Sequence, residues 1–308
     1  MRIGRVREIW RFPVKSMAGE RLAGAALGPL GIPGDRGWAL RDDEAGEIRG
    51  AKKWPALMQC AARYRREPDG RGVPPVDITL PDGSRTASDD PEVDARLSAL
   101  VGSRVSLWPL QPAADRQHYR RVPLAPALLV RLGQVRALRP LIPLFIKLGR
   151  LEPRLRELLG REPEEPLPDF GILPPELFEY TSPPGTYFDA YPVHLLTTAS
   201  LAAMARLHPA AAWDARRFRP NFLVEAEVGV EGLVEAEWSG RTVRLGEAAL
   251  RCEIPTVRCG MTTHAQDGLP KDPSVLRAIV RDADQNLGTY ARVARPGRVA
   301  VGDAVELV

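Results

Sequence analysis

Short runs of alternating apolar and polar residues fill the first third of the chain. Runs such as VREIW at 6–10 and ALRDD at 39–43 are separated by glycine and proline residues that favour turns, a pattern typical of short β-strands. The segment 78–88 carries Pro-Asp-Gly at its centre and predicts a hairpin. The pattern predicts a small β domain over residues 1–110.

One short helix interrupts this β pattern, over residues 91–101. Asp90 can accept hydrogen bonds from the first free N–H groups, Pro91 suits the first helical position, and Gly102 can end the helix. The apolar residues of this segment share one face: Val93, Leu97, Leu100 and Val101.

The apolar spacing becomes helical between about residues 111 and 180. APALLVRLGQVRAL at 125–138 and LEPRLRELLG at 151–160 place apolar residues on one face and arginines on the opposite face. REPEEPLP at 161–168 is rich in proline and predicts an extended connector. We therefore expect a helical insertion over 111–180.

A β pattern returns in the last part of the chain, over residues 181–308. It opens with one helix, for which Thr198 or Ser200 is the expected N-cap and Pro209 the stop. The final run, VAVGDAVEL, alternates with a period of two, as expected of a strand in an antiparallel barrel. The predicted strands lie at 221–228, 235–245, 249–254 and within 291–307.

Length and composition agree with a folded protein of two domains, or of one domain with a sizeable insertion. The chain has 308 residues, of which 44% are hydrophobic and 27% charged. Its three cysteines are too few for a disulfide scaffold and indicate a reducing compartment. No signal peptide is recognisable, and charges and prolines interrupt the most apolar window, 122–148, so that it cannot span a bilayer. We expect a cytoplasmic protein.

Positive charge is concentrated in the predicted insertion. The chain carries a net charge of +4, yet residues 116–161 hold eleven Lys or Arg and two Glu. A solvated helix surface is the favoured interpretation, and a surface for an anionic partner or lipid headgroups is the alternative. Few aromatic residues interleave with these charges and no known module is present, so we expect no nucleic-acid partner.

Cys259 is the cysteine best placed for chemistry. It follows a strand whose expected end is Pro255, and the neighbouring Arg258 favours the thiolate, the form that binds metals. The alternative is a buried and inert cysteine, which is the favoured interpretation for Cys252 and Cys60. Zinc is disfavoured, because the cysteine and histidine spacing matches no zinc site.

Three other short stretches place polar or cationic residues beside turns. RFPVKSMAG (11–19) carries Lys15 and Ser16, GIPGDRGW (31–38) carries Arg36, and RRFRPN (216–221) carries Arg219 and Asn221. Each alone is most simply a surface residue. Together with Cys259 they would form a pocket with one thiolate and several anion donors, suited to a phosphorylated cofactor that carries a metal.

These motifs, in this order, resemble the MOSC family with its N-terminal β-barrel domain. The resemblance leaves about 111–170 uncovered, and it implies a mainly β (α+β) fold with an N-terminal β-barrel-like domain, a helical insertion and a C-terminal MOSC β-barrel. The N-terminal motifs are FPVKSMAG (12–19), GIPGDRGW (31–38) and AKKWPALM (51–58). The C-terminal motifs are YPVHLLTTASL (191–201), RRFRPNFLV (216–224), PTVRC (255–259), LGTYARV (287–293) and GRVAVGDAVEL (297–307).

The resemblance further implies the molybdenum cofactor, molybdopterin, and similarity to the mitochondrial amidoxime-reducing component and its bacterial relatives. By motif, Cys259 would be the metal ligand and the catalytic residue. The family also carries a general association with pyridoxal phosphate binding. The residues that would line the pterin pocket are Lys15, Ser16, Arg36, Arg219, Asn221, Arg258 and Tyr290.

The activity implied is reduction of a small N-hydroxylated (N-oxygenated) substrate. The sequence shows no ferredoxin-like extension with four cysteines, so we expect electrons from a separate ferredoxin- or flavodoxin-like donor. Residues after Cys259 read THAQDGLP, which departs from the family pattern on the substrate side. The alternatives are a protein that binds or carries the cofactor without turnover, and a structural barrel in which Cys259 is inert.

Overall fold

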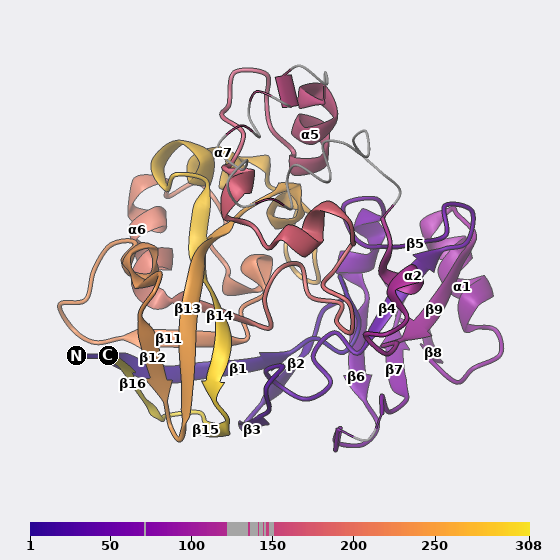
Figure 1. Cartoon of the computed structure of the whole chain (residues 1–308), viewed down its shortest axis with the longest axis horizontal. Helices are drawn as coiled ribbons and strands as arrows, with labels where there is room; N and C mark the ends of the chain where they lie inside the picture. Colours follow the sequence, from indigo (N-terminus) through magenta and orange to yellow (C-terminus); the bar gives the residue numbers. More distant parts are fainter. Residues whose placement is uncertain (71, 122–134, 136–140, 142–143, 145, 148–150) are drawn as a thin grey trace.

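The computed structural model describes residues 1–70, 72–121, 135, 141, 144, 146–147 and 151–308. These form a mainly β protein with a barrel in its C-terminal part, as the sequence predicted (Figure 1). None of the described helices is long and apolar enough to cross a membrane. The predicted helix at 125–138 lies almost entirely outside the described residues.

A closed barrel of seven strands is the largest body of the molecule. Its neighbours are antiparallel except for one parallel pair, β10 with β11. Alternate side chains point inward and form a continuous apolar core that includes Ile3, Val193 and Phe222. In order of pairing, the strands are β11 (Phe222–Ala226), β10 (Val193–Thr197), β14 (Asn286–Arg295), β13 (Ala248–Val257), β12 (Thr242–Leu245), β16 (Ala304–Leu307) and β1 (Arg2–Arg11).

The barrel is closed by the first strand of the chain. β1 pairs with β16 on one side and with β11 on the other. Figure 1 shows this indigo strand beside the orange and yellow strands, with the two termini next to each other. Two further N-terminal strands join the same part of the molecule: β2 (Glu20–Leu22) pairs with β1, and β3 (Gly24–Leu27) pairs with β15 (Gly297–Ala300). Residues 1–110 therefore contribute to two bodies of sheet.

The rest of the N-terminal part holds two small antiparallel sheets around its own core. The predicted hairpin is present as β7 and β8, and the predicted helix is present as α1 (Val93–Val101), ending at Gly102 with φ 65°. The first sheet contains β5 (Glu47–Arg49), β4 (Trp38–Asp42) and β9 (Val105–Pro109). The second contains β6 (Ala61–Tyr64), β7 (Val76–Thr79) and β8 (Arg85–Ala87), and η1 (Pro55–Gln59) precedes it.

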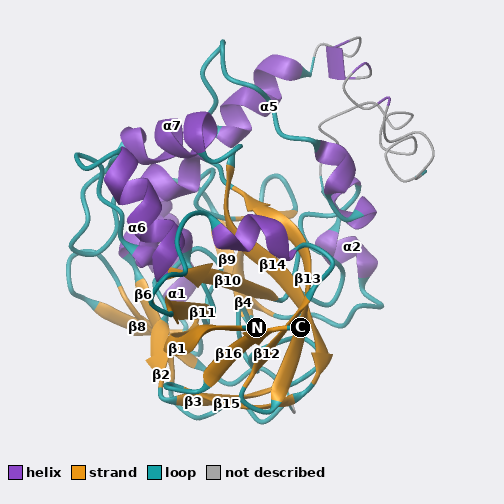
Figure 2. Cartoon of the chain, turned by 90° about the vertical axis from the view of Figure 1, so that its left-hand side faces the viewer, coloured by secondary structure: helices purple, strands orange, loops and turns teal. Residues whose placement is uncertain are grey.

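Helices gather at one end of the barrel, where Figure 2 shows α5, α6 and α7 beyond the strands. The predicted helix at 151–160 is α5, and 161–168 contains no helix or strand, as expected. The helices are α2 (Arg116–Tyr119), α5 (Glu152–Leu159), α6 (Thr198–Leu207) and α7 (Pro273–Asp282). The short 3-10 helices are η3 (Phe170–Ile172), η4 (Pro175–Phe178), η5 (Ala215–Phe218), η6 (Val234–Trp238) and η7 (Gly260–Thr263).

The N-cap predicted for α6 from the sequence is wrong. Thr197, rather than Thr198 or Ser200, caps this helix, because β10 ends at Thr197 in an extended conformation. The Thr197 hydroxyl then accepts a hydrogen bond from the Ser200 N–H at 3.1 Å.

Two predicted strand boundaries also need correction. The first half of 235–245 is the 3-10 helix η6, in which the buried Glu235 carboxylate accepts hydrogen bonds from the Thr197 N–H and the Ser200 hydroxyl. β13 does not end at Pro255 but continues to Val257. The register shifts on both sides of Pro255 let the strand accommodate a residue without an N–H group.

Candidate active site

Cys259 lies at the end of a barrel strand, in a short turn. It lies two residues after Val257, where β13 ends, and is the N-cap of η7. Its carbonyl oxygen accepts hydrogen bonds from the backbone N–H and the hydroxyl of Thr262, both at 3.1 Å. The thiol is free and half-buried. The turn therefore holds the backbone of Cys259 and leaves its side chain accessible.

The other two cysteines belong to the core, as predicted. Cys60 and Cys252 are free and fully buried. Burial raises the pKa of each thiol to about 12, so both stay protonated at neutral pH. Neither has the access that a metal ligand or nucleophile requires.

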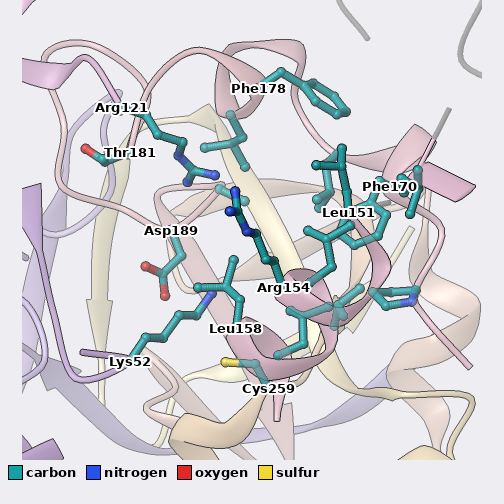
Figure 3. A pocket seen from close by; sticks show the side chains of 18 of the residues that line it. Lys52, Arg121, Leu151, Arg154, Leu158, Phe170, Phe178, Thr181, Asp189 and Cys259 are labelled. Atoms are coloured by element: carbon teal, nitrogen blue, oxygen red, sulfur yellow. The ribbon is translucent and has the colours of Figure 1, made fainter. Parts of the chain in front are cut away.

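Cys259 opens onto a cavity of about 280 Å³ between the barrel and the insertion (Figure 3). Most of its wall is apolar and comes from α5 and the chain that follows it. The apolar side chains of that segment are Leu151, Leu155, Leu158, Leu159, Pro168, Phe170, Leu173, Leu177 and Phe178. The residues with polar side chains in the wall are Lys52, Arg121, Arg154, Thr181, Asp189, Cys259 and Tyr290.

Asp189 connects the cavity to a group of cations behind it. Its carboxylate accepts a hydrogen bond from Lys15 Nζ at 2.7 Å and is open to the cavity. Burial opposes its ionisation, yet the charges of Lys15 and Lys52 outweigh burial and lower its pKa. Burial also lowers the pKa of Lys15. Lys15 itself does not line the cavity, but it is hydrogen bonded to Asp189, which does.

Arg36 and Arg219 meet at the ring of Phe12. Their guanidinium carbons lie 4.9 and 4.1 Å from the ring centroid. Arg36 forms an ion pair with Asp35, whereas Arg219 Nη1 donates to the Met17 carbonyl at 2.5 Å. Arg219 Nη2 is buried and has no hydrogen-bond partner among the described residues. Burial, helped by the charge of Arg36, lowers the pKa of Arg219 to about 9.

Backbone strain is concentrated at the same place. Ser16, Arg36 and Arg219 have φ values of 71°, 52° and 53°, in the left-handed region that residues other than glycine seldom adopt. Only Asp284 and Gln285 share this property in the described part of the chain. Such strain persists where surrounding structure enforces it, and it is common at binding sites.

Ser16 and Asn221 are engaged in holding the loops together. The Ser16 hydroxyl accepts a hydrogen bond from the Ala51 N–H at 2.9 Å. Asn221 accepts from the His194 N–H at 3.0 Å and donates to Asp35 at 3.0 Å. These contacts join the N-terminal loops to the barrel, so both side chains position their neighbours.

Arg258 points into the protein and away from the cavity. Its guanidinium donates to the carbonyls of Leu287 and Phe218 at 2.9 and 3.2 Å and contacts His194 Nε2 at 2.6 Å. Burial, followed by the charge of Arg258, lowers the pKa of His194 well below its usual value, so its ring is neutral and accepts from Arg258. This pair anchors the chain between the end of β13 and Cys259.

Arg161 is a site residue that sequence reasoning missed. It is buried, and its Nη2 donates to the Arg258 carbonyl at 2.9 Å. Its Nε and Nη1 atoms are buried without a hydrogen-bond partner within the described segments. Cys259 is among the groups that act on its pKa, which burial lowers. No motif identifies Arg161, since it stands at the start of a proline-rich connector.

Of the eight residues predicted for the site, Cys259 and Tyr290 line the cavity itself. Arg121, Arg154 and Asp189 also line it but belong to none of the motifs used for the prediction, and Lys52 lines it from the motif at 51–58, in which it was not singled out. Within the described residues, no cluster of three or more His, Cys, Asp or Glu side chains could hold a metal ion.

Each of the two β-rich parts of the chain matches a known family of domains. Residues 3–105 match the MOSC N-terminal beta barrel domain, and residues 184–306 match the MOSC domain. Residues 106–183, which include α5 and much of the cavity wall, lie outside both matches.

Several solved structures are similar to this chain. The YUAD protein from Bacillus subtilis is 13% identical, with 99% of this chain and 95% of that chain covered and a TM-score of 0.40. YiiM from Escherichia coli is 23% identical over 38% of this chain and 53% of that chain, with a TM-score of 0.28. The chain thus spans about half the length of YiiM. No curated protein matches the chain.

Proposed function

The chain belongs to the MOSC family, and from this premise we propose that it is a molybdenum-cofactor-dependent oxidoreductase that reduces N-hydroxylated substrates. The family is associated with binding of the molybdenum cofactor. The observation that carries the proposal is the free Cys259 thiol, which opens onto a substrate-sized cavity beside a group of buried cations. Neither family match supports the association with pyridoxal phosphate.

The residues at the site fit an anionic cofactor. Among the described residues, the buried Nη2 of Arg219 has no hydrogen-bond partner, and neither have Nε and Nη1 of Arg161. Each is a donor ready for an anion, and guanidinium groups bind phosphate well. Arg36 and Lys15 add two further cations, which are paired with Asp35 and Asp189. Thiolate ligands suit soft metal centres, which supports Cys259 as the metal ligand.

When bound, the cofactor would supply the two-electron chemistry. Cys259 would hold the metal, and Arg36, Arg219 and Lys15 would hold the phosphate. Burial raises the pKa of Tyr290, so its phenol keeps its proton and can donate a hydrogen bond to a substrate oxygen. The leucines of α5 exclude water from the cavity, which strengthens these polar interactions.

In the overall reaction, two electrons and two protons enter, the N–O bond of the substrate breaks, and the oxygen leaves as water. The electrons come from a separate ferredoxin- or flavodoxin-like protein, whose acidic surface would dock on the basic insertion. Such docking should weaken as salt rises, because exposed charges are screened. A reducing compartment such as the cytoplasm keeps all three thiols free.

The cavity favours turnover over carriage of the cofactor alone. A carrier needs only polar contacts to the cofactor, whereas the wall of this cavity is mostly apolar, which suits a small organic substrate. Metal analysis of protein from a molybdenum-replete host distinguishes an enzyme or a cofactor carrier, which would contain molybdenum, from a barrel with an inert Cys259, which would not. Turnover of an N-hydroxylated amidine with a reduced dye then separates an enzyme from a carrier.

Three cysteine variants test the assignment of the ligand. Cys259→Ala should abolish molybdenum retention or turnover, whereas Cys252→Ala and Cys60→Ala should mainly lower the melting temperature, because both thiols are buried in cores. Molybdenum content, dye-linked turnover and thermal unfolding are measured on all three. Retained metal and activity in Cys259→Ala, with activity lost in Cys252→Ala, would show that the ligand is wrongly assigned.

A further inference from the structure

The cavity beside Cys259 has two chemically different ends. Figure 3 shows Cys259, Lys52 and Asp189 at one end, and the guanidinium groups of Arg121 and Arg154 together at another. Leucines and phenylalanines of the insertion line the space between them. A ligand that fills this cavity should therefore be apolar along its body and negatively charged at the end that contacts Arg121 and Arg154.

Arg121 and Arg154 are two like charges in the wall of one cavity. Within the described part of the chain, neither guanidinium forms a hydrogen bond or an ion pair. By contrast, the neighbouring Arg120 is paired with Glu179, and Arg156 is paired with Glu152. An anion that lies near both guanidinium groups is attracted by both charges.

The surrounding sequence offers no carboxylate for this role. From Arg116 to Leu151 the chain contains no Asp or Glu at all, although it contains eight Lys or Arg residues. Asp189, the one acidic residue of the cavity wall, is hydrogen bonded to Lys15. Burial lowers the pKa of Arg121, with the charge of Glu47 acting in the opposite direction. Among the described residues no carboxylate forms an ion pair with either guanidinium, so both can bind an anionic ligand.

We propose that the substrate is an apolar molecule with an anionic group, a carboxylate or phosphate, that binds between Arg121 and Arg154. Its apolar body lies against the leucines of α5, and its N-hydroxylated end lies at Cys259. The proposal rests on the proposed function for the identity of the reacting group. Arg121 and Arg154 are then specificity-determining residues, contributed by the part of the chain that neither family match covers.

The anion could also be the phosphate of the cofactor, and direct binding distinguishes the two sources. Isothermal titration of the full-length, metal-loaded protein compares octanoate with octanamide, which has the same length and no charge. Octanoate should bind more tightly. Arg121→Gln and Arg154→Gln should each weaken octanoate binding about tenfold or more and leave octanamide binding within about twofold. Arg120→Gln, the matched control outside the cavity, should change neither.

Pterin and molybdenum contents are measured on the same samples. Unchanged contents in Arg121→Gln and Arg154→Gln, together with weaker octanoate binding, would support a substrate anion. Lost pterin would assign the arginines to the cofactor and overturn the proposal, as would equal affinity for octanoate and octanamide. Because Arg154 is exposed on its helix, Arg154→Gln should fold even where Arg121→Gln does not.

Kinetics separate this inference from the proposed function. With benzamidoxime and its 4-carboxy derivative as substrates, the carboxylate should lower KM, and both variants should remove this advantage with little change in kcat. Turnover of both compounds with equal KM would overturn the inference and leave the function standing. Arginine-dependent octanoate binding without turnover of either compound would overturn the function and support the anion site.

Discussion

The guanidinium of Arg219 is buried, and its Nη2 has no hydrogen-bond acceptor among the described residues. An unpaired buried donor costs free energy, about 1–3 kcal/mol, unless a ligand accepts from it. Burial, followed by the charge of Arg36, lowers the pKa of Arg219 to about 9, although Asp35 and Asp189 act in the opposite direction. Arg36 stands on the same phenylalanine ring but has Asp35 as its partner. The two residues should therefore share one anion and differ in how much they depend on it.

We expect Arg36→Ala and Arg219→Ala each to weaken cofactor binding by roughly ten- to a hundredfold, since a charge-assisted hydrogen bond contributes about 1.5–3 kcal/mol. Their effects should be less than additive, because neighbouring sites couple. Pterin content and thermal unfolding are the measurements. Arg244→Ala, on the exposed face of β12, is the control. Equal pterin content in all variants, at an unchanged melting temperature, would refute a shared phosphate site.

Glu235 makes the stability of the barrel depend on pH. Its carboxyl is fully buried, and burial raises its pKa although hydrogen bonds from Ser200 and Thr197 act in the opposite direction. The folded state therefore binds this proton more tightly than the unfolded state. The contribution of the neutral carboxyl is complete below the ordinary pKa of glutamate and is lost as pH rises through the raised value.

Glu235→Gln should remove this dependence, because the amide keeps an acceptor for the Thr197 N–H and cannot ionise. Urea unfolding at pH 5 and pH 8 measures the change. The wild type should lose more stability than Glu235→Gln between the two values. An identical loss in both proteins would mean that Glu235 does not titrate in this range.

At the scale of elements, α5 is joined to the turn that carries Cys259. Gly160 caps α5 with φ 67°, and a Cβ placed there would lie 3.0 Å from Gly260 Cα. Arg161 donates to the Arg258 carbonyl from the same corner. The C-terminus of α5 therefore sets the distance between the cavity wall and the candidate metal ligand.

Gly160→Ala and Gly102→Ala separate backbone strain from this close approach. Both glycines cap helices in the left-handed region, with φ 67° and 65°, but Gly102 has nothing within 4 Å of an added Cβ. Each variant should lose about 1–2 kcal/mol of stability from strain. Only Gly160→Ala should also lower molybdenum content, because it moves the turn at Cys259. Equal molybdenum content in both would mean that α5 does not control this turn.

The elements predicted from local sequence pattern differ in how closely they agree with the structure. The hairpin around Pro81 and the helix that ends at Gly102 are confirmed, because their turns and caps lie within a few residues. The strand expected at 235–245 begins as a 3-10 helix, because Glu235 is held by β10 and α6. Alternation in a short segment cannot reveal a partner that lies forty residues away in the chain.

At the scale of the whole molecule, the two ends of the chain form one barrel. The Met1 amino group donates to the Leu307 carbonyl at 2.8 Å, and β1 fills the gap between β16 and β11. Without β1, both of these strands would expose an unpaired edge. Exposed edges favour aggregation. The C-terminal β domain is therefore incomplete without the first residues of the chain.

Residues 184–308 alone should aggregate or unfold without cooperativity. A fusion that attaches residues 1–11 after Val308 through a short glycine-rich turn restores the seventh strand, since β16 and β1 are antiparallel neighbours. It should unfold cooperatively in urea. The two proteins differ in β1 and its turn alone. The same unfolding midpoint in both would show that β1 is dispensable for the barrel.

The sequence by itself determined the mainly β fold class, most of the strands, the helices α1, α5 and α6, and the family, because periodicity, caps and motifs are properties of near neighbours in the chain. It also singled out Cys259 from the two core cysteines through its place beyond a strand. Only the tertiary structure decided that β1 closes the C-terminal barrel, that Arg258 points inward to His194, and that α5 lines the cavity at the thiol. These depend on sheet closure and burial, which join residues far apart in sequence and leave no local pattern.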